Sequence, residues 1–196
     1  MADTSRTQSD LLTSLFPDGQ AANSITAQDM RDLIVSLSMR GGYADYNDLA
    51  TATTPLSHTG GVDTYLTNDA AGANTAKNWI NPGITDVWDD VADEFDWSEL
   101  AVGDTVDIRF DIDVTTTAAN QEIDIDLEMA SGDAIQFDLH FLRDSFKTAG
   151  TYKIGAVAMI YIGSATVQTT PAKFKLSSAS NASIQVNGWF CRVVKV

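Results

Sequence analysis

The chain has 196 residues, 44% of them hydrophobic, which is enough apolar material for a packed core and argues against wholesale disorder. Its 27 acidic and 12 basic residues give a formal net charge of −15. Such a surface repels nucleic acid and anionic lipid, so we expect no nucleic acid and no membrane as partner. The one cysteine, Cys191, excludes an internal disulfide framework and a multi-cysteine metal cluster.

The N-terminal region lacks the features of an exported or membrane-anchored protein. No apolar run approaches the roughly 20 residues that a membrane helix needs. The first ten residues do not have the charged-then-apolar layout of a secretory signal. We therefore expect synthesis in the cytoplasm without a signal peptide.

A short amphipathic helix is predicted before the glycine pair at 41–42. Thr26 is a natural N-cap, and Asp29 three residues later completes a capping box. A helix of about fourteen residues is marginal alone in water, so its apolar stripe must be covered. The cover is either the C-terminal domain or identical helices from neighbouring subunits around a symmetry axis. The stripe and the residue before its cap are Ile25, Met30, Leu33, Ile34 and Leu37.

The next segment favours the second of these alternatives. Residues 43–61 are rich in Ala and Thr and carry Pro55, which is typical of a linker that separates the helix from the rest. The sequence then divides into a helical attachment or trimerisation segment at 1–42, a linker at 43–61 and a β domain at 62–196. We therefore expect the helices of neighbouring subunits to cover one another.

Large aromatic residues follow at the start of the β domain. Trp79, Trp88 and Trp97 are interspersed with acidic residues and with no basic one. Aromatic residues in such a loop usually pin it onto a sheet edge. The alternative is an exposed surface that stacks on sugar or contacts a partner, and these three tryptophans are the candidate residues of that surface contact loop.

Three runs with strict apolar–polar alternation form the centre of the sequence, at 104–114, 121–129 and 133–142. Side chains on a strand point to opposite faces with a period of two, so each run has one apolar and one mainly polar face. We expect these runs to form one antiparallel sheet, with the acidic face toward water or a partner.

The acidic face raises the question of a bound cation. Asp111 and Asp113 share one face of the first run, and Asp124 and Asp126 share one face of the second. If the two runs are adjacent, these like charges repel unless water, a basic residue or calcium compensates them. Full solvation is the default, calcium is the alternative, and no other cofactor is expected.

Residues 151–163 are apolar on both faces, as in a strand that is covered on both sides. One of the covering surfaces can belong to another subunit, and we name Ile154 and Ile160 as interface candidates. With the runs at 172–177 and 183–196, the sequence contains about seven or eight strands. The predicted fold is therefore mainly β, an antiparallel jelly-roll sandwich preceded by the short helical segment.

No catalytic motif is visible. The two histidines, His58 and His140, have no signature partner, and the sequence contains no phosphate-binding loop, zinc spacing or nucleophile elbow. We therefore expect a protein that is not an enzyme.

Two regions resemble proteins of tailed bacteriophages. The segment SITAQDMRDLIVSL resembles a short helical segment near the start of phage fibre and spike proteins. The stretches TNDAAGANTAKNW, PGITDVWD, FDWSELAVGDTVDIRFDIDVTTTAANQEIDIDLEM and FKLSSASNASIQVNGWFCRVV resemble a domain of virion fibres that is similar to the trimeric jelly roll of the tumour-necrosis-factor kind. The resemblance covers residues 23–196 and brings no catalytic motif with it.

The resemblance implies a homotrimeric structural protein of the virion, as a fibre, a spike or a capsid decoration protein. Its N-terminal segment would attach to other virion proteins of the capsid or tail, and the trimer would contact a glycan or protein on the host surface. The alternatives are a polysaccharide-binding module and a depolymerase carried on the fibre, which would need a groove with convergent carboxylates.

Overall fold

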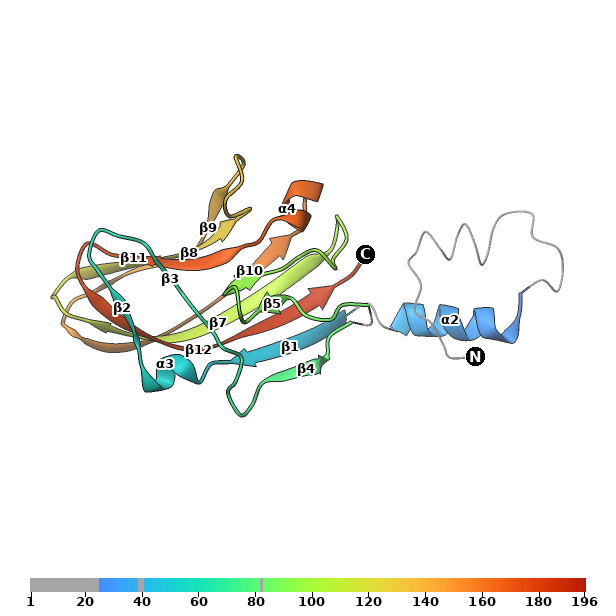
Figure 1. Ribbon diagram of the computed structural model, residues 1–196, viewed down its shortest axis with the longest axis horizontal. Coiled ribbons are helices and arrows are strands. Elements are labelled where there is room, and N and C mark those ends of the chain that lie inside the picture. Colours follow the sequence, from blue (N-terminus) through green and yellow to red (C-terminus); the bar gives the residue numbers. More distant parts are fainter. Residues whose placement is uncertain (1–24, 39–40, 82) are drawn as a thin grey trace.

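Two antiparallel sheets pack face to face in the computed structural model, which describes residues 25–38, 41–81 and 83–196 (Figure 1). In spatial order, sheet A contains β10 (Gly150–Tyr161), β7 (Thr105–Thr116), β12 (Ala182–Val194), β1 (Gly41–Asn47) and β4 (Ala76–Trp79), and β2 (Leu56–His58) also pairs with β12. Sheet B contains β3 (Thr64–Tyr65), β11 (Lys173–Ser177), β8 (Gln121–Met129) and β9 (Phe137–Phe146). The remaining elements are the β5–β6 hairpin (Trp88–Asp89, Glu94–Phe95) and the short helices α3 (Ala50–Thr53) and α4 (Ala165–Thr169).

The strand order identifies the fold as a jelly roll. The sandwich strands follow one another along the chain as β1, β3, β7, β8, β9, β10, β11 and β12. In space, the first lies beside the eighth, the second beside the seventh, the third beside the sixth and the fourth beside the fifth. This nesting of antiparallel pairs is the double Greek key of a jelly roll. The predicted fold class, a mainly β antiparallel jelly-roll sandwich, is confirmed.

The alternating sequence of β7 explains its place at the middle of sheet A. Every second side chain is fully buried: Val106, Ile108, Phe110, Ile112 and Val114. The side chains between them lie on the outer face, which is the period of two expected for a sheet with one buried side. The facing row from β8 consists of Ile123, Ile125, Leu127 and Met129, all buried. The two rows form the middle of a single core between the sheets.

The expectation that the three central runs share one sheet is wrong. β8 pairs with β9, but β7 pairs with β10 and β12 in the other sheet. The short connection at residues 117–120 therefore crosses from sheet A to sheet B. Alternation shows that a strand has one buried face, and both sheets of a sandwich satisfy that condition equally.

The expectation of a linker at residues 43–61 is also wrong. β1 pairs with β12 along seven residues and with β4 on its other side. Ala44 and Tyr46 are completely buried, and β2 adds a further pairing to β12. The described part of the sandwich therefore begins at Gly41.

The N-terminal helix has the predicted position and cap. α2 spans Ala27–Ser38, and Thr26 and Asp29 form a reciprocal capping box. The Asp29 N–H donates to Thr26 Oγ1 at 3.1 Å, and the Thr26 N–H donates to Asp29 Oδ2 at 2.7 Å. Figure 1 shows α2 beyond the end of the sandwich that carries β4. Within the described residues, no helix has the length and apolar character needed to cross a membrane.

An aromatic cluster fills one end of the core. Trp97 is fully buried and stacks on Phe95, with ring centroids 5.1 Å apart and planes inclined by 4°. Trp88 and Trp189 meet Phe95 and each other from the sides. The segment around β5 and β6 is thereby held to the sandwich by its aromatic side chains.

We expect Trp97→Ala to lower the free energy of unfolding by about 3–5 kcal/mol, because the substitution leaves a large cavity in the core. Urea denaturation followed by tryptophan fluorescence measures the change. Trp79→Ala is the matched control, since Trp79 is 62% exposed, and it should cost less than about 1 kcal/mol. Equal losses in the two variants would contradict the assignment of Trp97 to the core.

Candidate functional site

The outer face of sheet A carries a continuous group of aromatic, apolar and basic side chains, which we call the aromatic face. Its members come from five strands that are far apart in the sequence and adjacent in the sheet. They are Tyr43, Trp79, Arg109, Val157, Met159, Tyr161, Phe190 and Arg192.

The strand register places these residues in two rows across the sheet. In one row, Phe190 of β12 lies opposite Arg109 of β7, which lies opposite Val157 of β10. In the neighbouring row, Trp79 of β4 lies opposite Tyr43 of β1, and the row continues through Arg192 and Asp107 to Met159. Residues directly opposite on one face of an antiparallel pair are in contact range, so the rows form one surface.

Ring stacking ties the two rows together. The Tyr43 ring stacks on Trp79 with centroids 6.4 Å apart and on Phe190 with centroids 5.5 Å apart. The Arg109 guanidinium lies over the Phe190 ring, 5.7 Å from its centroid, in a cation–π contact. The aromatic face is therefore ordered on a rigid sheet, which lowers the entropic cost of binding a partner there.

The exposed end of this surface is the edge strand β10. Val157 and Met159 are each 67% exposed and Tyr161 is 58% exposed, although the strand is twelve residues long. A long edge strand with exposed apolar side chains readily joins another chain. Its exposure is the most unusual feature of the described surface.

The two residues of β10 that were predicted to lie in the interface point into the core. Ile154 and Ile160 are buried in the core of the same chain, at 7% and 1% exposure, so they cannot meet another subunit. The sequence is apolar on both faces of this strand, and a period of two alone does not reveal which face turns inward. The uncovered residues are those between the named ones: Val157, Met159 and Tyr161.

On the helix, the predicted stripe is open where it is described. Ile25, Met30 and Ile34 are 45%, 45% and 61% exposed, and Leu33 is half-buried. The side chain of Leu37 lies outside the described residues. The residues named for this part of the interface are therefore available for contact, and their role in a trimer stays a prediction.

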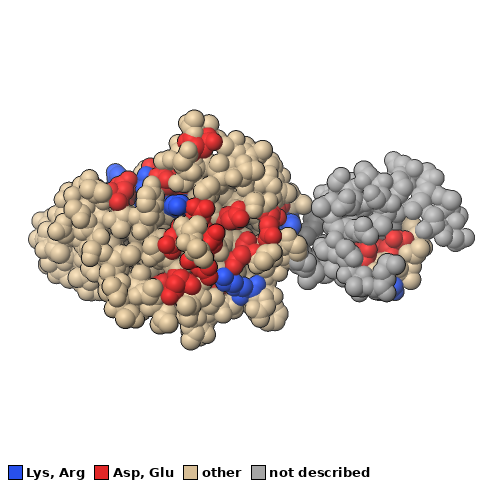
Figure 2. Space-filling model, viewed as in Figure 1, with Lys and Arg blue, Asp and Glu red and all other residues tan. Residues whose placement is uncertain are grey.

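The charges on the aromatic face nearly balance. The carboxylates on this side of sheet A are Asp45, Asp107, Asp111 and Asp113, and the basic groups there are Arg109, Lys153 and Arg192. Ion pairs join Arg109 to Asp111 at 2.8 Å, Lys153 to Asp113 at 3.2 Å and Arg192 to Asp107 at 3.6 Å. By contrast, Figure 2 shows acidic side chains outnumbering basic ones on the view that it draws.

Partial burial acts on one of these carboxylates. Desolvation raises the pKa of Asp45 above its ordinary value, and the nearby positive charge of Arg109 opposes that shift. On this face, the strongly acidic protein therefore presents little net charge.

The structure separates the three tryptophans of the predicted contact loop. Trp79 is exposed and belongs to the aromatic face. Trp88 and Trp97 are buried in the core, and the indole N–H of Trp88 donates to the carbonyl oxygen of Asn68 at 2.8 Å. The interpretation of these two residues as surface contacts is wrong, and the alternative of a loop pinned to the sheet is confirmed for them.

The outer face of sheet B is charged and closely paired. Glu128 is 3% exposed, and Lys175 reaches its Oε2 at 3.4 Å and Asp138 Oδ2 at 2.9 Å. Burial alone lowers the pKa of Lys175, but the two carboxylates raise it above its ordinary value. Sequence reasoning missed this network, whose signal is the basic residue that alternates with apolar ones in β11.

The four carboxylates considered for calcium do not meet. Asp111 and Asp113 lie on sheet A, where Arg109 and Lys153 pair with them. Asp124 and Asp126 lie on the opposite sheet, and Arg143 forms an ion pair with Asp124. A calcium site built from both pairs is therefore excluded, and the expected repulsion between adjacent strands is relieved by their separation.

Comparison with known proteins identifies no family. The sequence matches no protein-family model and no curated protein. Among solved structures, the chain is similar to Eiger TNF from S. frugiperda, with 7% identity, a TM-score of 0.46, and coverage of 80% of this chain and 94% of that one. It is also similar to the PRD1 vertex protein P5, with 13% identity, a TM-score of 0.40, and coverage of 81% and 98%.

A further similarity is to a chain of the T13 particle of IBDV, with 9% identity and a TM-score of 0.45. It covers 80% of this chain but 31% of that one, so this chain spans about a third of its length. At such identities and scores, these likenesses carry no information about what the chain binds or where it acts.

We expect Lys175→Met to lower the free energy of unfolding by about 3–5 kcal/mol, because it leaves the buried Glu128 carboxylate without its cation. Chemical denaturation at neutral pH measures the loss. Lys153→Met is the matched control on sheet A, since its side chain is 86% exposed and its ion pair contributes at most about 1 kcal/mol. A loss below 1 kcal/mol for Lys175→Met would show that the pair on sheet B is no more than a surface ion pair.

Proposed function

We propose that the protein is a non-enzymatic structural protein of a tailed-bacteriophage virion, a homotrimeric fibre, spike or capsid decoration protein. The observation that carries the proposal is the aromatic face, which a single described chain leaves uncovered along β10. Copies of the same chain are the occupants that we propose for it. The number three and the place on a virion come from the resemblance of the sequence to trimeric fibre domains.

The composition of the aromatic face supports a protein partner. The centres of protein interfaces are enriched in Tyr, Trp, Phe, Met and Arg and depleted in Lys and Glu. The aromatic face contains all five enriched residue types, and the four aspartates and one lysine beside it belong to depleted types. Its side chains are held on hydrogen-bonded strands, so the surface is ordered before a partner binds.

The charge distribution supports a second copy over an unrelated partner. Two chains of net charge −15 repel one another unless the surfaces that meet are close to neutral. On the aromatic face, four carboxylates stand against three basic groups, and each basic group forms an ion pair. Association through this face therefore avoids most of the repulsion between the copies.

The exposed stripe of α2 adds a second surface of the same kind. Met30 and Ile34 extend outward from a helix that is too short to be stable by itself, so packing against other copies would stabilise it. A parallel bundle of three such helices needs apolar positions at this spacing. The two surfaces would then hold the trimer at the sheet and at the helix.

We expect the chain to be a trimer at micromolar concentration and the double variant Val157→Asp, Met159→Asp to be a monomer. Each aspartate would place a charge where an apolar side chain is buried between copies, and a buried unpaired charge is strongly unfavourable. Native mass spectrometry and sedimentation velocity of the full chain measure the state directly.

Val91→Asp is the control for this experiment, because Val91 is 89% exposed and lies outside the aromatic face. It should leave the trimer intact. Ile34→Asp tests the helix separately and should weaken the trimer without unfolding the sandwich. A wild-type monomer, or a trimer that survives the double variant, would contradict the proposal for the aromatic face.

Two further parts of the proposal concern the particle and the host. Residues 1–42 would attach the trimer to a capsid or tail protein, which imaging of particles with a tag at Val196 would locate. Contact with a host-surface glycan or protein would be measured by binding of labelled protein to host cells. Absence of the tag from the particle would remove the virion from the proposal.

A further inference from the structure

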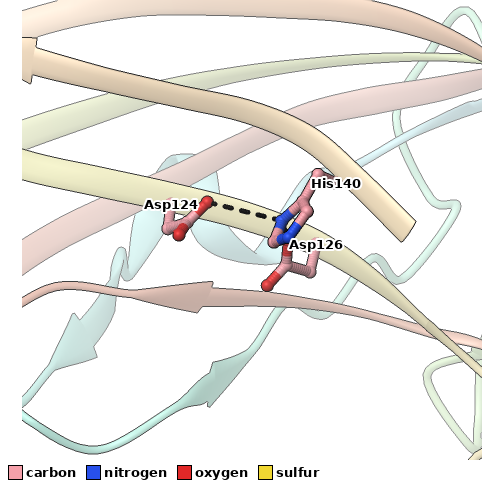
Figure 3. A group of neighbouring side chains, drawn as sticks. All are labelled: Asp124, Asp126 and His140. Atoms are coloured by element: carbon pink, nitrogen blue, oxygen red, sulfur yellow. Dashed lines mark hydrogen bonds and ion pairs between the residues drawn. The ribbon is translucent and has the colours of Figure 1, made fainter. Parts of the chain in front are cut away.

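Three side chains on the outer face of sheet B converge on one point (Figure 3). Asp124 and Asp126 are two residues apart on β8 and share its outer face. His140 of β9 lies directly opposite Asp126 in the sheet register. The ligand atoms of the three side chains all lie within 4.8 Å of one another.

The closest contacts run through one ring nitrogen. Nδ1 of His140 lies 2.5 Å from Asp126 Oδ1 and 3.9 Å from Asp124 Oδ1. Nδ1 is therefore in hydrogen-bond contact with Asp126 and lies near the second carboxylate without bonding to it. The position between them suits a cation that can accept all three ligands.

A second observation comes from Asp124 itself. The residue is 8% exposed, and its Oδ1 is buried without a hydrogen-bond partner. The other carboxylate oxygen, Oδ2, accepts from the Arg143 guanidinium, which fixes the carboxylate so that Oδ1 is turned toward His140. A buried carboxylate oxygen without a donor is costly, and a bound cation removes that cost.

The basic residues near this cluster already form ion pairs. Arg143 pairs with Asp124, and Lys175 pairs with Glu128 and Asp138. Among the described residues, no lysine or arginine forms an ion pair with Asp126. In that part of the chain, Asp126 has its ion-pair contact with the imidazole of His140.

From these contacts we propose that Asp124, Asp126 and His140 bind a divalent first-row transition-metal ion, with zinc as the probe. Imidazole with two carboxylates suits zinc and its neighbours, whereas calcium prefers oxygen ligands alone. Ligand bonds of about 2.0–2.2 Å place neighbouring donor atoms roughly 3–3.5 Å apart, so a small side-chain rotation from the observed positions completes the set. The ion lies between the three ligand atoms, and water fills the remaining positions on the exposed side.

The site has a structural consequence for the sandwich. β9 is the edge strand of sheet B and pairs only with β8 in its sheet. An ion held by two ligands of β8 and one of β9 cross-links the two strands. It therefore stabilises the edge strand. A chain with one cysteine cannot form an internal disulfide, and the bound ion would supply a cross-link in its place.

The histidines of the chain make the test clean. His58, the other histidine, is buried, and its ring nitrogens contact Thr64 Oγ1 at 2.9 Å and the Ser178 carbonyl oxygen at 3.2 Å. Cys191 is also buried in the core. In a protein without a purification tag, His140 is thus the imidazole available to a metal.

The experiment measures zinc binding to the untagged full chain by titration calorimetry, and cobalt binding by visible absorption. We expect one saturable site per chain, a rise in melting temperature with zinc, and slower amide exchange in β9. His140→Ala, at an exposed position, should weaken binding by more than the roughly 10–100-fold that loss of a supporting residue causes. Asp124→Asn should weaken it too.

Glu122→Gln is the matched control. Glu122 lies on the same face of β8, its side chain is 62% exposed, and it is outside the three-residue set, so zinc affinity should remain within about threefold of the wild type. No saturable zinc binding up to millimolar concentration would show a proton-bridged triad only and overturn the proposal. Equal affinity in His140→Ala, or equal binding of calcium, would overturn it as well.

Discussion

The structure depends on the burial of one face of the central sandwich strands against the opposite sheet. Val106 to Val114 of β7 and Ile123 to Met129 of β8 supply the facing rows, and every apolar member of both rows is buried. Removal of such side chains from water is the dominant favourable term in folding. Because the apolar residues are committed inward, the outer faces are free to carry other chemistry. The outer faces of sheets A and B differ in the side chains that they carry.

On sheet B, the outer face is polar but is closed by pairing. Three of the four acids of β8 that point away from the core are nevertheless buried: Asp124, Asp126 and Glu128 are 8%, 7% and 3% exposed. Longer side chains from the neighbouring strands, Arg143, His140 and Lys175, extend over them. Buried carboxylates require such partners. The acidic face is therefore an organised network and not the solvated surface that alternation suggests.

The sequence predicts the strands well and their assembly less well. The period of two identifies β7, β8 and the buried side of each, and the capping box identifies the start of α2. It does not assign β7 and β8 to different sheets, because both sheets present the same alternation to a common core. For β10, both faces are apolar, so the choice of Ile154 and Ile160 over Val157 and Met159 had no basis in periodicity. The aromatic segment is a second example: the sequence does not show that Trp79 is exposed and Trp97 is buried.

The candidate sites were hardest to predict because each is formed by strands that are distant in sequence. The aromatic face joins residues 43, 79, 109, 157 and 190, and only the pairing of β1, β4, β7, β10 and β12 brings them together. The cluster on sheet B is more local, because β8 and β9 are consecutive. Even so, the bulge between Ile125 and Asp126 sets which residue faces His140. A one-residue change in register there would turn the histidine away from both aspartates.

The two outer faces can act independently because the whole core lies between them. A partner on sheet A would meet side chains of β7, β10 and β12, whereas a cation on sheet B would meet β8 and β9. An assembly through sheet A would leave β9, an edge strand of sheet B, exposed. Charged side chains on an exposed edge strand keep that strand from pairing with other chains. The charged network on sheet B therefore opposes association at that sheet, whereas the nearly neutral face on sheet A permits it.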